Sequence, residues 1–179
     1  MNPFEGKNAA PNREKIQELV AALLLDVGVV RFDFEKGFVF ASGKRSPLYV
    51  DHRKLTGYPT HWELVTHLLG ERTGGADVVA GVATGGIPYS APTALLHGLP
   101  HAYVRKDKKG HGTGSLIEGA SVRGKRVVVI EDMVTTGGSL LHAVDALYAA
   151  GAAYVSCVAI STYGFASTGA QFVQRGVML

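Results

Sequence analysis

The sequence contains a single cysteine, Cys157, among 179 residues. One thiol cannot form a disulfide within the chain, and the apolar segment 154–160 around it is typical of a buried strand. No apolar run approaches the ~18 residues that a membrane-spanning helix needs, since Asp26 interrupts the longest one. The first residues also lack the basic and apolar segments of a secretory signal. These absences predict a cytoplasmic protein without membrane contact.

The sequence has no large excess of charge of one sign, because it contains 18 basic and 15 acidic residues and its net charge is +3. The basic side chains are nevertheless unevenly distributed, with a cluster in residues 105–111. The cluster consists of Arg105, Lys106, Lys108, Lys109 and His111. A compact polyanion such as a diphosphate suits a local cluster, whereas nucleic acid needs a broader basic stripe. We therefore expect a small anionic ligand and no nucleic-acid partner.

The length and composition favour one globular domain over residues 1–179. Hydrophobic residues make up 46% of the chain, and the mean hydropathy is +0.13. No internal repeat, low-complexity tract or linker divides it.

Periodicity predicts an α/β fold with a central, mostly parallel sheet flanked by helices. The N-terminal part is expected to hold a helix over 16–27 capped by Asn12, two short strands around a turn at 35–37, and a strand at 48–50. A capping box at Thr60 and Glu63 is expected to open the next helix. The remaining elements are strands at 77–82, 101–104, 126–130 and 154–160, and helices at 60–72, 86–97 and 137–150. Ligands of such sheets bind beyond the carboxyl ends of the strands, here the loops 84–88, 105–119 and 131–139.

The clearest chemical signal lies in residues 127–139. An apolar strand leads to two adjacent acids, Glu131 and Asp132, and then to a turn of small hydroxyl and glycine residues at 135–139 that starts a helix. Amides at a helix N-terminus bind anions, and glycines let a phosphate approach the backbone. The upstream carboxylates can accept hydrogen bonds from sugar hydroxyls. The segment is therefore a candidate sugar-phosphate site.

An alternative is an ordinary turn whose hydroxyls only cap the helix. The paired acids weigh against it, because adjacent carboxylates repel each other. A Walker phosphate loop is excluded, since no Gly-Lys-Thr or Gly-Lys-Ser occurs in the chain.

Three segments together resemble the orotate phosphoribosyltransferases, members of the type I phosphoribosyltransferases. Residues 127–139 are similar to the donor-binding motif of that family, 42–54 to its N-terminal signature, and 103–119 to its mobile catalytic loop. The resemblance implies a type I fold with an N-terminal helix and hood over about 1–58, a core over about 59–165, and a mobile loop at 105–119. It also implies transfer of ribose 5-phosphate from 5-phosphoribosyl 1-diphosphate to orotate, which gives orotidine 5′-monophosphate and pyrophosphate.

The resemblance assigns a role to each candidate site residue. Glu131 and Asp132 would hold the ribose hydroxyls, and Thr135 would also touch the pyrimidine. The loop formed by Thr84, Gly85 and Gly86 would meet the pyrophosphate. The expected donor-binding set is Arg105, Lys106, Lys109, His111, Glu131, Asp132, Met133, Val134, Thr135, Thr136, Gly137, Gly138 and Ser139, and the expected catalytic set is Lys109, Arg105, His111 and Asp132.

The resemblance further implies Mg²⁺ and a homodimer with shared active sites. The seven histidines show no zinc spacing, and Mg²⁺ held mainly by ligand oxygens needs no protein cage. Lys109 and His111 would reach into the neighbouring subunit's site.

Two features depart from the family pattern. Ala41 stands where many members have a lysine, and residues 161–165 lack the arginine that some members place after the last core strand. Members also usually continue beyond the position of Leu179. The alternatives are a phosphoribosyltransferase for another base, against which the 42–54 signature argues, and a nucleotide-sensing regulator, which would need an added basic helix that the sequence lacks.

Overall fold

The structure is a computed structural model, and it describes residues 13–39, 43, 45–107 and 115–179. The chain divides into two units, residues 1–61 and residues 62–179. The expectation of a single domain over the whole chain stays a prediction.

The first unit contains a helix and two short antiparallel pairs of strands. Helix α1 covers Arg13–Asp26 as expected, while its proposed cap, Asn12, lies outside the described residues. Strand β1 (Val30–Phe32) pairs with β4 (Leu48–Val50), and β2 (Phe38–Val39) pairs with β3 (Arg45–Ser46). A 3-10 helix, η1, follows at His52–Gly57.

The turn at 35–37 is present, but the strands flanking it do not pair with each other. The Asp33 carboxylate accepts hydrogen bonds from the backbone amides of Glu35 (3.1 Å) and Lys36 (2.9 Å) and so closes the turn locally. Both flanking strands instead pair with residues 45–50, further along the chain. The first of these strands also ends at Phe32 rather than at residue 34.

Helix α2 covers Pro59–Gly70, so the expected capping box is wrong. Thr60 lies inside the helix, which begins one residue earlier with a proline. Proline suits a first helical position because its fixed φ is already helical and its missing N–H has no partner to lose there.

The second unit is built on a five-stranded sheet, which confirms the predicted fold class. Its strands are β5 (Val78–Val82), β6 (His101–Val104), β7 (Ile117–Gly119), β8 (Arg126–Val134) and β9 (Tyr154–Thr162), in the order β7-β6-β5-β8-β9. All neighbours are parallel except β6 and β7, which are antiparallel. Strand β7 lies in the segment that was expected to be wholly loop.

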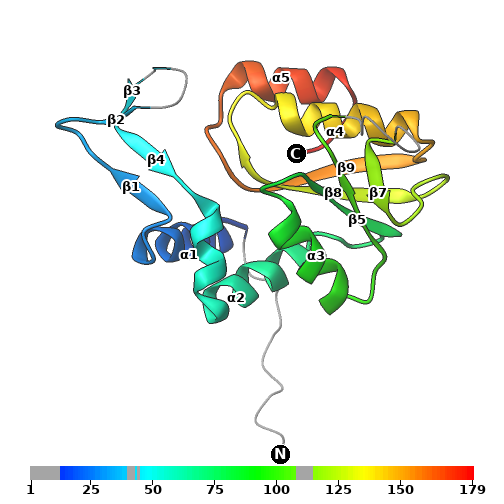
Figure 1. Ribbon diagram of the computed structural model, residues 1–179, viewed down its shortest axis with the longest axis horizontal. Coiled ribbons are helices and arrows are strands. Elements are labelled where there is room, and N and C mark those ends of the chain that lie inside the picture. The colour runs from blue at the N-terminus through cyan, green and yellow to red at the C-terminus, as the bar shows by residue number, and fades with distance from the viewer. Residues whose placement is uncertain (1–12, 40–42, 44, 108–114) are drawn as a thin grey trace, which may run out of the picture. The chain divides into compact units, whose positions relative to one another are not determined.

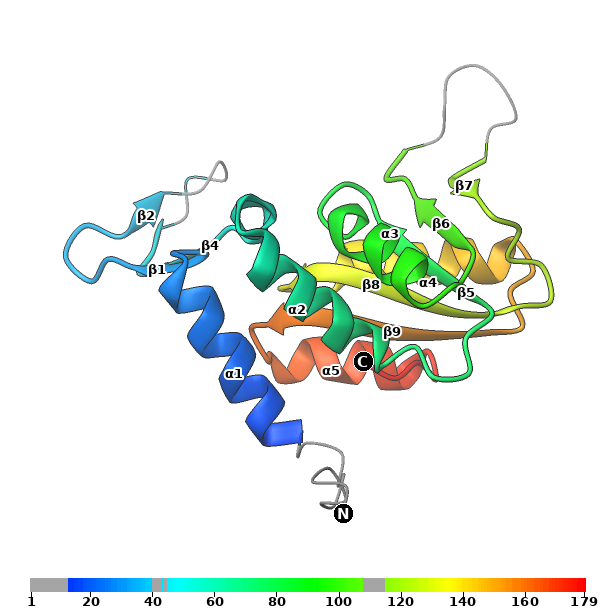
Figure 2. The ribbon, with the colours of Figure 1, turned by 90° about the horizontal axis from the view of Figure 1, so that it is seen from below.

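Helices cover both faces of this sheet (Figure 1). Helix α3 (Ile87–Leu96) packs on one face, and α4 (Gly138–Ala149) and α5 (Ala166–Gln174) lie on the other (Figure 2). All residues of β5 are buried, as a strand covered on both faces requires.

Cys157 is buried in β9 as predicted, and burial raises the pKa of its thiol to about 12. Helix α5 was not predicted. Within the described residues, no helix combines the length and apolarity needed to cross a membrane.

Strand β8 is longer than predicted and carries the two acids within it. Its pairing with β9 continues through Glu131↔Ala159 and Met133↔Ser161 to Val134↔Thr162. Hydrogen bonds between strands involve only backbone groups, so the charge of Glu131 and Asp132 does not prevent pairing. Strand β9 is as long as β8 and therefore extends β8 past Ile130, where the sequence predicted its end. The acids are therefore fixed to the sheet rather than to a loop.

Candidate active site

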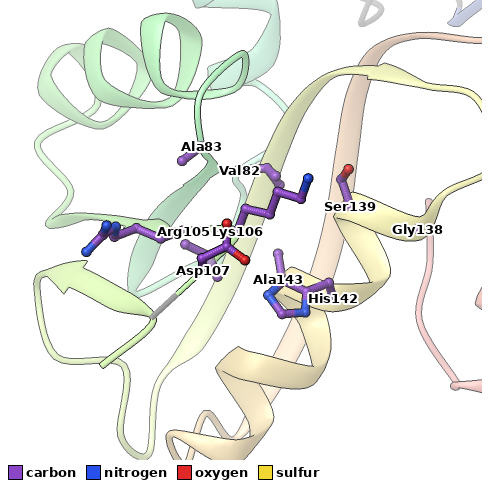
Figure 3. Close-up of a pocket in the computed structure, with 10 residues that line it drawn as sticks. Val82, Ala83, Arg105, Lys106, Asp107, Gly138, Ser139, His142 and Ala143 are labelled. Atoms are coloured by element: carbon purple, nitrogen blue, oxygen red, sulfur yellow. The ribbon is translucent and has the colours of Figure 1, made fainter. Parts of the chain in front are cut away.

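The ends of β5 and β6, the residues that follow them and the first turn of α4 line an open cavity of about 320 Å³ at the carboxyl edge of the sheet (Figure 3). The cavity is lined by Val82, Ala83, Val104, Arg105, Lys106, Asp107, Gly138, Ser139, His142 and Ala143. One wall is therefore the first turn of α4, and the opposite walls are the ends of two neighbouring strands.

The paired acids lie at the end of β8 in unequal environments. Glu131 is only 5% exposed, and Asp132 is half-buried. Burial and the neighbouring Asp132 carboxyl, as hydrogen-bond partner and as charge, together raise the pKa of Glu131 to about 9. Glu131 is thus protonated at neutral pH. A protonated acid beside a carboxylate can both donate and accept hydrogen bonds, which suits the hydroxyls of a sugar.

The predicted pyrophosphate loop lies directly against these acids. A Cβ atom added to Gly85 would lie 2.5 Å from Oδ1 of Asp132, and one added to Gly86 would lie 2.3 Å from the carbonyl oxygen of Ile130. The preceding peptide bond, between Ala83 and Thr84, is cis. The two glycines therefore allow a contact that any side chain would prevent, and the structure brings segments 84–86 and 131–132 together.

The turn at 135–139 presents its polar groups to solvent. Thr135, Thr136, Gly138 and Ser139 are exposed, and Gly137 is buried with a left-handed φ of 81°. Gly137 is the N-cap of α4 and provides no side-chain hydrogen bond. The alternative that a hydroxyl side chain serves as the N-cap of this helix therefore does not apply.

Side chains of helix α5 contact the turn at 135–139. Thr168 donates a hydrogen bond from its hydroxyl to the carbonyl oxygen of Thr135 (3.0 Å). A Cβ atom on Gly137 would lie 2.9 Å from the Phe172 ring and 3.1 Å from Thr168. Both α5 side chains are buried. The turn is thus held in place by a helix that sequence reasoning missed.

The two described cations of the predicted pyrophosphate-binding set point in opposite directions. The side chain of Lys106 extends across the cavity toward Ser139, whereas that of Arg105 leaves on the other side (Figure 3). The guanidinium of Arg105 lies 3.7 Å from a carboxylate oxygen of Glu118 on β7. Lys109 and His111 lie outside the described residues, as do residues 42 and 44 of the N-terminal signature.

Sequence reasoning also missed His142, which lines the cavity on α4. It stands three residues after Ser139, the spacing that places two side chains on one helix face. That spacing could have identified it once the helix start was fixed. Asp107 lines the cavity too and was passed over as one more charge in a basic segment.

The family model described as "Phosphoribosyl transferase domain" matches residues 62–167. An orotate phosphoribosyltransferase of Listeria monocytogenes is 45% identical over 155 residues, which cover 84% of this chain and 74% of that protein. One from Bacteroides thetaiotaomicron is 42% identical over 156 residues, with 85% and 74% covered.

Solved structures agree with these sequence matches. The crystal structure of orotate phosphoribosyltransferase from Aeropyrum pernix superimposes with a TM-score of 0.75 at 34% identity, covering 89% of this chain and 93% of that one. The Mycobacterium tuberculosis enzyme, in complex with 5-phospho-α-D-ribosyl 1-diphosphate, has a TM-score of 0.67 at 30% identity, with 90% and 93% covered. Because the family model covers residues 62–167 and orotate phosphoribosyltransferases match most of the chain in both sequence and structure, the chain belongs to the orotate phosphoribosyltransferase family.

Proposed function

We propose that this chain transfers ribose 5-phosphate from 5-phosphoribosyl 1-diphosphate to orotate. The observation that carries the proposal is the contact of Gly85 with Asp132 next to the exposed turn at the start of α4. It places three groups at one sheet edge, each suited to a different part of the donor.

Each part of the donor has a matching surface in this arrangement. The 5′-phosphate would bind the amides and hydroxyls of residues 135–139, because the N-terminus of a helix favours an anion. The ribose hydroxyls would bind Glu131 and Asp132. The diphosphate would lie against residues 84–86, with Lys106 reaching over it from the cavity side.

The chemistry requires stabilisation of the departing diphosphate. As its bond to the anomeric carbon of the ribose breaks, the leaving group takes the electron pair, and the ribose ring becomes an oxocarbenium-like cation. Cations that contact the leaving group more closely in the transition state than in the ground state lower the barrier. Lys106 and Arg105 are the described candidates, and Lys109 and His111 complete the set on sequence grounds.

Mg²⁺ fits this site as a cation carried by the donor. Within the described part of the chain, no three His, Cys, Asp or Glu side chains converge as a metal cage. Mg²⁺ tends to keep water and ligand oxygens around it, so the diphosphate and ribose oxygens would hold it while Glu131 and Asp132 hold the ribose. Bound there, it would offset negative charge on the diphosphate.

We further propose that two copies of the chain share their active sites, through Lys109 and His111 of the catalytic loop. The location proposed for the reaction is the cytoplasm, in line with the unpaired and buried Cys157.

An assay with several bases tests the proposed function. Purified protein is mixed with 5-phosphoribosyl 1-diphosphate, Mg²⁺ and orotate, uracil, adenine or hypoxanthine in turn, and consumption of the base is followed by absorbance. We expect turnover with orotate that requires both the donor and Mg²⁺. Turnover of a purine or of uracil in preference to orotate would replace this function with that of a related transferase.

A further inference from the structure

Arg105 is held on the β7 side of its strand by an ion pair with Glu118. The Arg105 Nη1 atom lies 3.7 Å from Oε1 of Glu118, and both side chains are about 70% buried, with exposed fractions of 30% and 28%. The backbone reinforces this position, because the Arg105 amide donates to the carbonyl oxygen of Leu116 (2.8 Å). Glu118 itself is opposite Tyr103 in the β6–β7 ladder, so it stands diagonally across from Arg105.

This position leaves the guanidinium incompletely satisfied. The Nη1 atom of Arg105 is buried and has no hydrogen-bond partner among the described residues, and 3.7 Å is too long for a hydrogen bond. Arginine carries five N–H donors and prefers paired bonds to carboxylate or phosphate oxygens. The pairing with Glu118 is therefore electrostatic and loose, and a better acceptor would compete with it.

A better acceptor is expected beside it. Arg105 is one of the residues that line the cavity, and its neighbour Lys106 already points into that cavity (Figure 3). A diphosphate in this region would offer the oxygens that Glu118 does not place within hydrogen-bond distance.

We propose that Glu118 is a positioning residue that competes with the diphosphate for Arg105. In the absence of the diphosphate, Glu118 holds the guanidinium against β7. When the diphosphate binds, the Arg105 guanidinium leaves Glu118 and donates hydrogen bonds to the diphosphate oxygens. The inference rests on the proposed function, because it assumes that a diphosphate binds at this edge. Loss of the Glu118 charge frees Arg105 and tightens diphosphate binding.

A purely structural role for the pair predicts something else. If Glu118 and Arg105 only attach the edge strand β7 to β6, removal of the charge lowers thermal stability and leaves ligand affinity unchanged. A general electrostatic effect of one fewer negative charge predicts tighter binding that does not depend on Arg105.

A double-mutant cycle separates these explanations. The dissociation constant of magnesium pyrophosphate is measured by calorimetry for the wild type, Glu118→Gln, Arg105→Gln and the double variant. Asp145→Asn is the matched control, because Asp145 forms a comparable, partly exposed ion pair with Arg175 (3.5 Å) on the outer surface of α4. Thermal melting accompanies each titration, and KM for the ribosyl donor and kcat are measured in the orotate assay.

Glu118→Gln is expected to bind pyrophosphate roughly twofold to fivefold more tightly, the range that a partly exposed ion pair supports. KM for the donor should fall in parallel while kcat changes little, and the gain should vanish when Arg105 is glutamine. Arg105→Gln alone should weaken binding by about tenfold, as the loss of a charge-assisted contact predicts. Asp145→Asn should bind as the wild type does.

Several results would overturn the proposal. Unchanged or weaker binding by Glu118→Gln, an equal gain in the Arg105→Gln background, or an equal gain in Asp145→Asn would each contradict competition for Arg105. Should Glu118→Gln fail to fold, unchanged binding by Arg105→Gln would still refute it. Pyrophosphate binding without orotate turnover would refute the proposed function and leave this inference standing.

Discussion

At the scale of single residues, the protonation of Glu131 has a measurable consequence. The pKa of its carboxyl is about 9 in the folded protein, against a usual value of 4.5. Between these two values the unfolded chain has lost a proton that the folded chain keeps. Linkage then requires that stability be fully present below pH 4.5 and fall as the pH rises toward 9.

Glu131→Gln should remove this dependence, because glutamine keeps the shape and the hydrogen-bonding groups but does not titrate. The wild type should lose stability relative to the variant as the pH rises across this window, by roughly 1 kcal/mol per pH unit at most. Denaturant unfolding at pH 5, 7 and 8.5 measures the difference. Parallel pH profiles for the two proteins would show that the Glu131 carboxyl is ionised in the fold.

Gly85 is the second residue whose identity the structure demands. An alanine there would place its Cβ atom 2.5 Å from the Asp132 carboxylate, which would have to move. Because the Met133 amide donates a hydrogen bond to Oδ1 of Asp132 (2.9 Å), displacement of this oxygen should cost about 1 kcal/mol of stability. We also expect a rise of about tenfold in KM for the donor, the size of one lost charge-assisted hydrogen bond.

Gly74→Ala is the control for this variant, since nothing lies within 4 Å of its added Cβ atom. Steady-state kinetics of both variants, with thermal melting, provide the comparison. If Gly85→Ala keeps the KM of the wild type, Asp132 does not hold the ribose from its observed position.

At the scale of elements, α5 contributes more to the site than its sequence indicates. Only Thr168 and Phe172 of its residues are buried, and both lie against the turn at 135–139. The helix therefore supports the turn at 135–139 in addition to covering part of the sheet.

Thr168→Val should loosen the turn. The substitution keeps the shape of the side chain but removes its hydrogen bond to the Thr135 carbonyl, which leaves that oxygen without this partner and costs about 1 kcal/mol. KM for the donor should rise severalfold. Val173→Thr, the reverse exchange at a position 78% exposed on the same helix, should change neither value. Equal effects of the two exchanges would contradict a supporting role for α5.

The elements also show what could be predicted from the sequence. The core strands and helices were found because their apolar residues are buried on both sheet faces, as in β5. Helix α5 was missed because Phe172 and Val173 are the only large apolar residues among its nine, and its other buried side chain, Thr168, is polar. Strand β7 was missed because it has only three residues and forms by pairing with β6. The end of β8 was predicted too early, because its pairing with β9 continues through the two acids.

The same limit applies to the site. The acids, the turn and the glycine loop were identified because their chemistry is carried by residue type and order. The direction of Arg105 was not, because it depends on Glu118, which is thirteen residues away in sequence and becomes a neighbour only through the β6–β7 pairing.

At the scale of the whole molecule, the proposed sharing of active sites between two copies predicts complementation. Lys109→Ala would impair the loop that one subunit contributes, and Asp132→Asn would impair the donor site of the other. Mixed dimers of the two inactive variants should regain up to about a quarter of wild-type activity, because random pairing gives half hybrids with one intact site each. Activity assays after mixing and reassociation measure this. No recovery in confirmed hybrids would contradict shared sites.

The central claim of this account is that the carboxyl edge of the sheet holds the ribosyl donor through residues 84–86 and 131–139. A crystal structure of the protein with 5-phosphoribosyl 1-diphosphate and Mg²⁺ tests it most directly. The 5′-phosphate should lie on the amides at the start of α4, with the ribose hydroxyls within hydrogen-bond distance of Glu131 and Asp132. A donor bound elsewhere, with residues 131–139 free of any contact to it, would contradict the account.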